Sequence, residues 1–286
     1  MFVDAHQHFW SLSRKDYGWL TPRLGELYRD YLPGDLVPIL ASHGVQATVL
    51  IQAAPTEAET QYLFELADSH SFVAGVVGWV DFDGRDVERR LEALLARGNG
   101  KLKGLRPMVQ DIPDAQWLGR HELDRAFAAM TRHGLVFDAL VRPAQLEVLR
   151  ARLVRHPDLV AVLDHAGKPA IEHGDFDDWA RDIARLARDT RALCKLSGLL
   201  TEARGRRSRA DLMPYVKHIF ECFGATRVLW GSDWPVLNGV ADYVDWLRQA
   251  RELVGHCAKG QDTNVFGHNA VRAYKLDLTW TGDKPP

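Results

Sequence analysis

Four polar side chains in three distant segments have the types and spacing needed for hydrolytic chemistry. His6 and His8 lie two residues apart in the apolar run Phe2–Phe9, so on a strand both imidazoles would point to the same face. His165 and Asp233 each lie near the end of a similar run. Imidazoles polarise carbonyl groups or ligate metals, and a carboxylate activates water or completes a ligand set. We therefore take these four as candidate catalytic residues, provided that the fold brings them together.

Eight apolar or β-branched runs, each ending in polar, glycine or proline residues, predict the strands that position these groups. The predicted strands are Phe2–Phe9, Ala47–Ala53, Val73–Phe82, Leu102–Val109, Val136–Pro143, Leu159–Gly167, Ala192–Gly198 and Arg227–Pro235. Segments of helical period lie between most of them. This alternation predicts a single-domain, distorted (β/α)8 TIM barrel over residues 1–276 and a C-terminal tail over 277–286. The candidates would then share the rim formed by the C-terminal ends of the strands.

The other architecture compatible with this alternation is a doubly wound open sheet. It would normally bind a nucleotide through a glycine-rich first turn, and Asp4-Ala-His-Gln-His8 contains no glycine. The barrel is therefore favoured. The irregular segment from Trp10 to about Leu36 follows the first strand directly, and we expect it to form part of the active-site loops.

The composition argues against several kinds of partner. The formal net charge of −2 leaves no electrostatic footprint for nucleic acid or an anionic membrane. No apolar run approaches the roughly 20 residues needed to span a bilayer, and no signal peptide is visible. Three cysteines without metal-site spacing suit a reducing compartment. The sequence thus predicts a cytoplasmic protein with a small-molecule partner; no pattern predicts an oligomeric state.

Six motifs spread over nearly the whole chain, to about Leu276, carry a family resemblance. They are Val3-Asp-Ala-His-Gln-His-Phe-Trp10, Ile51-Gln-Ala-Ala-Pro55, Lys103-Gly-Leu-Arg-Pro107, Leu163-Asp-His-Ala-Gly-Lys-Pro169, Lys195-Leu-Ser-Gly198 and Trp230-Gly-Ser-Asp-Trp-Pro235. Together they resemble the amidohydrolase superfamily, and within it the sugar-lactonase branch, which includes L-fuconolactonase and L-rhamnonolactonase. The resemblance implies hydrolysis of a sugar-acid lactone, such as L-fuconolactone, to the aldonic acid.

The branch's roles carry onto matching positions of this chain. His6, His8 and His165 would polarise the lactone carbonyl, and Asp233 would be the general base that activates water. The same four residues would hold a single divalent ion such as Zn²⁺ if one is bound. A two-metal site is not expected, because Lys103 starts its strand and Val136–Pro143 has no histidine. Since the branch includes members that turn over without metal, we expect no obligatory cofactor.

Further polar and aromatic residues near the strand ends are candidate substrate contacts. Arg106 and Gln52 would hydrogen-bond sugar hydroxyls or the carbonyl, and Lys168 is either a substrate contact or a surface residue. Trp10 and Trp234 would stack on a sugar face or else pack in the core. Weaker candidates are Lys195, Ser197 and Glu202, and Asp4 is expected either to orient the loop of the first strand or to pair locally.

Two other functions are compatible with the same residues. A metal-dependent decarboxylase would use a similar set of histidines and aspartate, but it would need a tightly bound metal. A non-catalytic sugar-binding barrel would be favoured if one of the four polar residues were missing. All four are present.

Overall fold

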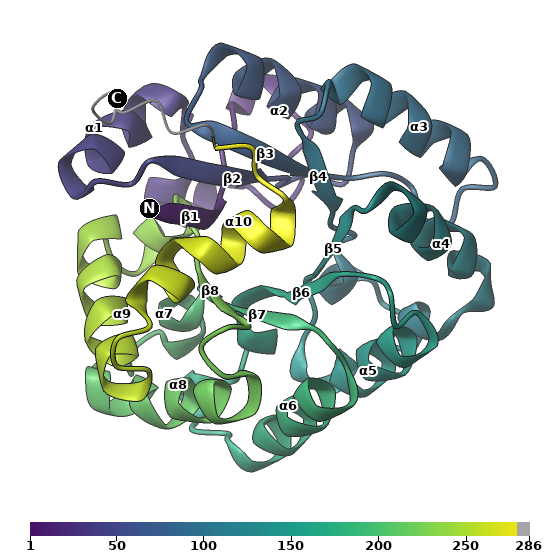
Figure 1. Ribbon diagram of the computed structural model, residues 1–286. Helices are drawn as coiled ribbons and strands as arrows, with labels where there is room; N and C mark the ends of the chain where they lie inside the picture. Colours follow the sequence, from purple (N-terminus) through teal and green to yellow (C-terminus); the bar gives the residue numbers. More distant parts are fainter. Residues whose placement is uncertain (279–286) are drawn as a thin grey trace.

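A computed structural model describes residues 1–278, and the part of the predicted tail from residue 279 onward lies outside this range. Eight parallel strands form one sheet in chain order, surrounded by helices, which confirms the predicted barrel (Figure 1). The strands are β1 (Val3–Gln7), β2 (Ala47–Ile51), β3 (Val73–Gly78), β4 (Leu102–Leu105), β5 (Val136–Ala139), β6 (Ala161–Leu163), β7 (Leu193–Leu196) and β8 (Val228–Trp230).

The barrel closes through the residues that follow β8 rather than through a full ladder between β1 and β8. Gln7 pairs with Trp234 in an isolated parallel bridge. The His6 carbonyl accepts from the Asp233 N–H at 2.8 Å, and the Trp234 carbonyl accepts from the His8 N–H at 2.7 Å. This irregular closure is the distortion of the barrel, and it fixes Asp233 beside the two histidines of β1.

The helices are α1 (Pro33–His43), α2 (Glu57–Ser69), α3 (Val87–Gly98), α4 (Asp124–His133), α5 (Leu146–Arg155), α6 (Asp177–Asp189), α7 (Leu199–Ala203), α8 (Arg209–Phe223), α9 (Tyr243–Cys257) and α10 (Asn269–Tyr274). The segment predicted to be irregular contains the start of α1. Pro38 lies inside this helix and has no N–H, so one backbone hydrogen bond of a regular helix is missing there. No helix within residues 1–278 is long and apolar enough to cross a membrane.

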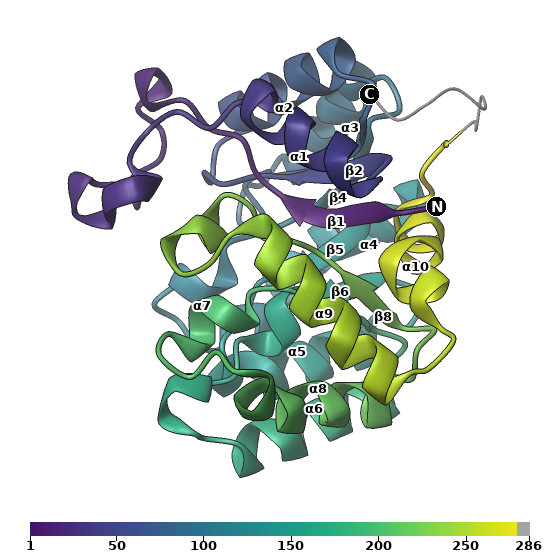
Figure 2. The same ribbon diagram turned by 90° about the vertical axis from the view of Figure 1, so that its left-hand side faces the viewer.

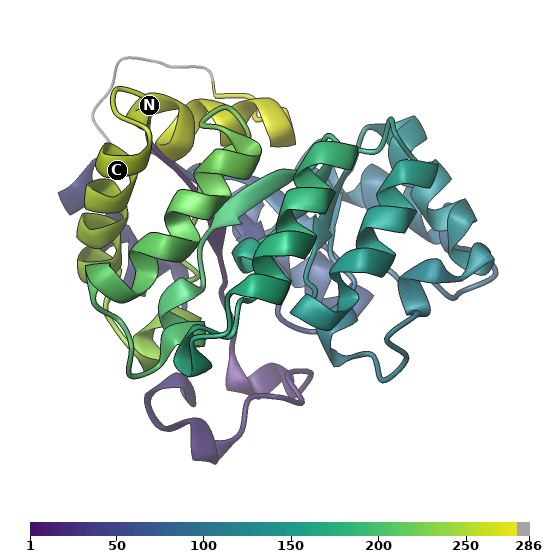
Figure 3. The ribbon, with the colours of Figure 1, turned by 90° about the horizontal axis from the view of Figure 1, so that it is seen from below.

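The two ends of the barrel are covered differently. The chain between β1 and α1 projects at one end, whereas α10 lies across the other (Figures 2 and 3). Ala270, Ala273 and Tyr274 of α10 belong to a buried cluster with strand residues such as Val3 and Val136. Helix α10 therefore plugs the N-terminal end of the barrel, and the C-terminal end is left for the site.

Candidate active site

The barrel brings the four predicted catalytic residues into one cluster, which we call the rim cluster: His6, His8, His165 and Asp233. His6 Nε2 lies 3.2 Å from His8 Nε2. Asp233 Oδ1 lies 3.4 Å from His8 Nε2, 3.7 Å from His6 Nε2 and 3.9 Å from His165 Nε2. All four side chains are almost fully buried. One carboxylate oxygen thus faces three imidazoles.

Two members of the rim cluster sit on left-handed backbone. His165 has φ 51° in the tight turn Asp164–Gly167 after β6, and Asp233 has φ 60° after β8. Left-handed conformations are costly for residues other than glycine and gather at functional sites. Gly198 makes room for His165, because a Cβ there would lie 2.6 Å from His165 Nδ1. The chain therefore holds both side chains inward against local preference.

Hydrogen bonds behind the rim fix the orientation of each ring. His8 Nδ1 lies 2.8 Å from the Ile51 carbonyl, which can only accept, so this nitrogen carries a proton. His165 Nδ1 lies 2.9 Å from Ser197 Oγ, which gives this weak sequence candidate a place in the site. Asp4 Oδ1 accepts from the nearby His6 N–H at 3.1 Å and also from the Ser232 N–H, after β8, at 2.9 Å.

A second buried cluster, which we call the lysine cluster, lies behind His6 and consists of Lys195, Asp138, Asp164 and Tyr274. Lys195 Nζ donates to Asp138 Oδ2 at 2.5 Å and forms an ion pair with Asp164 Oδ1 at 2.9 Å. The Tyr274 hydroxyl, from α10, donates to Asp138 Oδ1 at 2.8 Å. Lys195 Nζ is also 3.1 Å from His6 Nδ1. The two clusters therefore meet at one imidazole.

Burial decides the charge states of the rim cluster. Desolvation holds the pKa of His6 well below its ordinary value, helped by the Lys195 ammonium, and it lowers the pKa of His8 and brings that of His165 to about 4. Burial alone would raise the pKa of Asp233, but the adjacent imidazoles outweigh it and the pKa is lowered. At neutral pH the cluster is one carboxylate facing three neutral imidazoles.

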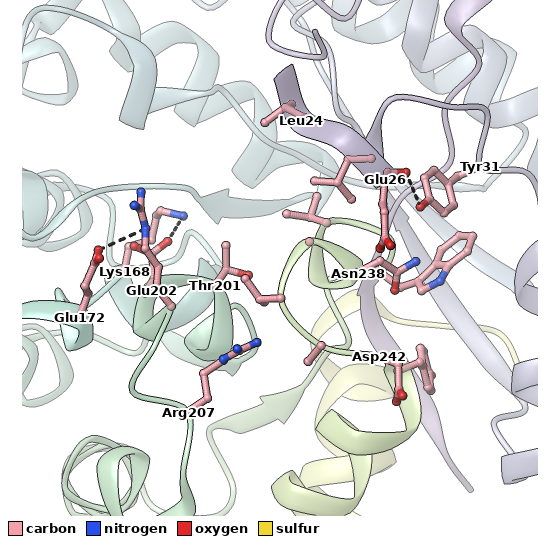
Figure 4. A pocket seen from close by; sticks show the side chains of 18 of the residues that line it. Leu24, Glu26, Tyr31, Lys168, Glu172, Thr201, Glu202, Arg207, Asn238 and Asp242 are labelled. Atoms are coloured by element: carbon pink, nitrogen blue, oxygen red, sulfur yellow. Dashed lines mark hydrogen bonds and ion pairs between the residues drawn. The ribbon is translucent and has the colours of Figure 1, made fainter. Parts of the chain in front are cut away.

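The rim cluster opens into an inner cavity of about 230 Å³, lined by His8, Arg106, His165 and Asp233 among others. Ala53, Met108, Leu140 and Val236 form its apolar walls, and Trp19 also lines it. Lys168 and Thr201 line both this cavity and an outer cleft of about 1940 Å³ (Figure 4). A small molecule can reach Asp233 through the cleft.

The predicted substrate contacts do not all reach the inner cavity. Arg106 lines the inner cavity, and Lys168 lies at its mouth, where it forms an ion pair with Glu202. Gln52 is fully buried and donates to the Arg106 carbonyl at 2.7 Å, so it positions Arg106 rather than meeting a substrate. Trp234 is 2 % exposed and lines the outer cleft.

Trp10 is not available for stacking on a sugar. It is fully buried, its indole N–H donates to the Arg29 carbonyl at 2.8 Å, and its ring packs edge-on against Trp19 and Tyr31. Of the two roles left open for it, the structure shows packing. Trp19 reaches the inner cavity instead, and no motif in the sequence distinguished it.

Sequence reasoning also missed Asp138, Asp164 and Tyr274. Asp164 precedes His165 in the family motif Leu163–Pro169, and this position could have indicated a role in the site. Asp138 lies in β5, within the apolar run Val136-Phe-Asp-Ala. A carboxylate in such a run indicates a buried charge, which needs a partner. Tyr274 carries no such signal, because its contact depends on where α10 packs.

The donor set of the rim cluster suits a single divalent ion. His6, His165 and Asp233 offer ligand atoms that all lie within 4.8 Å of one another, and His8 Nε2 lies beside them. Two nitrogens and a carboxylate are a common zinc set. The residues therefore fit one ion.

Comparison with known proteins gives the family. The amidohydrolase family matches residues 3–276. The chain is 43% identical over 282 residues to an L-fucono-1,5-lactonase of Burkholderia ambifaria, covering 96% of both chains, and 35% identical over 290 residues to one of Burkholderia multivorans, again covering 96% of both. It also superposes on a crystal structure of a Burkholderia multivorans amidohydrolase with bound zinc, with a TM-score of 0.89, 33% identity and coverage of 97% of this chain and 100% of that one. The chain belongs to the amidohydrolase family.

Proposed function

We propose that this protein hydrolyses a sugar lactone, L-fucono-1,5-lactone or a similar aldonolactone, to the aldonic acid. One observation carries the proposal: a buried carboxylate, Asp233, faces three imidazoles of lowered pKa at the wall of the inner cavity. The two lactonases that share most of their length with this chain support the substrate class.

In the proposed reaction Asp233 is the general base. Water bound in the inner cavity attacks the lactone carbonyl, and Asp233 accepts the proton that the water loses. The tetrahedral intermediate then expels the ring oxygen, and Asp233 returns the proton to it as the hydroxyl of the open acid. A carboxylate with a low pKa is a weak base, but a lactone is an activated ester and its carbonyl needs only modest help.

The His6 and His165 imidazoles and Arg106 stabilise the negative charge that develops on the carbonyl oxygen, whereas neutral His8 has its only N–H on the Ile51 carbonyl. Neutral histidines act as N–H donors, and the guanidinium adds a fixed positive charge. Arg106 is held in place by Gln52 on both its carbonyl and its guanidinium. Such preorganised donors act strongly because the side chains that carry them are almost fully buried.

A metal is not required by this scheme. When bound, a Zn²⁺ held by His6, His8, His165 and Asp233 would supply Lewis-acid polarisation of the carbonyl. Without an ion, the imidazole N–H donors and Arg106 would polarise the carbonyl instead.

The cavity fits one sugar ring. Its volume of about 230 Å³ lies below the usual range for drug-sized ligands. Its lining includes polar groups such as His8, Arg106 and Asp233, and Met108, Leu140 and Val236 supply apolar surface that suits the methyl group of a deoxy sugar.

A panel of aldonolactones assayed with a pH indicator, with and without chelator, tests the proposal. We expect acid release from L-fucono-1,5-lactone or a close stereoisomer in both conditions. Absence of turnover on every lactone of the panel would contradict the lactonase assignment. Activity only on an aromatic carboxylate, lost on chelation, would indicate the decarboxylase instead.

A further inference from the structure

Lys195 makes three polar contacts inside the barrel, and one of them is with His6. An ammonium has three N–H donors and no acceptor. Lys195 Nζ lies within 3.1 Å of three atoms with lone pairs, Asp138 Oδ2 at 2.5 Å, Asp164 Oδ1 at 2.9 Å and His6 Nδ1 at 3.1 Å. The contacts with Asp138 and His6 have hydrogen-bond geometry, and the contact with Asp164 is an ion pair. Because an ammonium cannot accept, His6 Nδ1 must supply the lone pair in its hydrogen bond with Lys195.

His6 has two neutral tautomers, and the surroundings of its ring discriminate between them. With the proton on Nε2, Nδ1 accepts from Lys195 at 3.1 Å, and Nε2–H donates to His8 Nε2 at 3.2 Å. His8 Nε2 is free to accept, because the Ile51 carbonyl keeps the proton of His8 on Nδ1.

The opposite tautomer makes longer contacts. With the proton on Nδ1, its acceptor would be Asp164 Oδ1 at 3.5 Å, and the donor to Nε2 would be Arg106 at 3.4 Å. It would also turn an N–H toward the Lys195 ammonium. Both the distances and the charge favour the proton on Nε2.

We propose that Lys195 is a positioning residue that fixes His6 in the tautomer protonated at Nε2. His6 then presents a hydrogen-bond donor to the rim cluster rather than a lone pair. The tautomer rests on the contacts alone; its value for turnover, as an N–H that His8 Nε2 would share with the oxygen of a bound lactone, rests on the proposed function.

The same tautomer opposes metal binding at His6. A ligating nitrogen needs its lone pair, so an ion on Nε2 would drive the proton to Nδ1, against Lys195. His8 offers a lone pair on Nε2 without any such rearrangement. Lys195 therefore weakens the metal site that the rim cluster would otherwise form.

Nitrogen-15 NMR of the chelator-treated wild-type protein tests the tautomer without any substitution near Lys195. The His6 signals are assigned by their loss in His6→Asn. We expect the chemical shift of a protonated nitrogen at Nε2 and of an unprotonated one at Nδ1. The reverse pattern would overturn the proposal, whatever the protein does to lactones.

Zinc affinity gives an independent readout. The double variant Lys195→Met/Asp138→Asn removes one positive and one negative charge, and Tyr274→Phe is the matched control, since it alters Asp138 without contacting His6. By titration calorimetry with Zn²⁺ we expect the double variant to bind about 10- to 100-fold more tightly than wild type, the range typical of groups that orient metal ligands. The control should match wild type. Equal affinity in all three folded proteins would overturn the proposal.

Discussion

The rim cluster and the lysine cluster meet at His6, and both contain buried carboxylates, yet different groups face those carboxylates. Each can be drawn as a metal site: His6, His165 and Asp233 in one, His6, Asp138 and Asp164 in the other. In the lysine cluster the Lys195 ammonium already lies within 3.1 Å of all three ligand atoms. In the rim cluster the carboxylate faces neutral rings and a cavity.

This difference separates a structural cluster from a reactive one. Where an internal cation neutralises buried carboxylates, their geometry is fixed and no reactant can enter. Where a carboxylate has only neutral donors and open space, it can exchange a proton with bound water. Substitutions in the two clusters should therefore affect different properties.

The largest expected effect is on catalysis in the rim cluster. Asp233→Asn removes the general base, and we expect kcat on the best lactone to fall by about 10²- to 10⁴-fold. Urea unfolding should show no loss of stability, because the variant removes a buried charge. Rates within a few-fold of wild type would contradict the role of Asp233.

The next effect is on stability in the lysine cluster. Lys195→Met leaves Asp138 and Asp164 buried without their cation, and we expect the free energy of unfolding to fall by about 3–5 kcal/mol in urea titrations. Adding Asp138→Asn should recover part of the loss. A loss of unfolding free energy below about 1 kcal/mol in the single variant would contradict the pairing of Lys195 with Asp138 and Asp164.

The pH profile should be set by the rim cluster alone. Burial lowers the pKa of His165 to about 4, and the adjacent imidazoles keep Asp233 ionised there, so kcat/KM should be flat through neutral pH and fall as pH drops toward about 4. Burial raises the pKa of Asp4 and Asp138 to about 6, so the folded chain binds their protons more tightly and their protonation does not oppose folding. Stopped-flow assays with circular dichroism at each pH check this; a midpoint near 6.5 would contradict it.

The smallest effect is expected at Tyr274. Tyr274→Phe removes one hydrogen bond to Asp138 while the Lys195 pairing stays. We expect a loss of about 1 kcal/mol in thermal or urea unfolding and kcat within about twofold of wild type. A large loss of kcat would show that the lysine cluster acts on turnover through α10.

The sequence predicted the rim cluster because motifs at strand ends converge in any closed barrel. It did not predict the lysine cluster as a unit: Lys195 was a weak candidate, and its partners come from β5, the turn after β6, and α10. Such contacts depend on side-chain directions inside the barrel. Trp10 and Trp19 show the same limit, since both are tryptophans of one loop and only packing decides which reaches the cavity.

We expect the rim cluster to open a sugar lactone with its own side chains and without a metal ion. The most direct test is turnover of L-fucono-1,5-lactone by wild-type protein stripped of metal, with metal content measured on the same sample. We predict the same kcat/KM before and after stripping, and no gain on adding Zn²⁺. Loss of activity on stripping, restored by Zn²⁺, would contradict the claim.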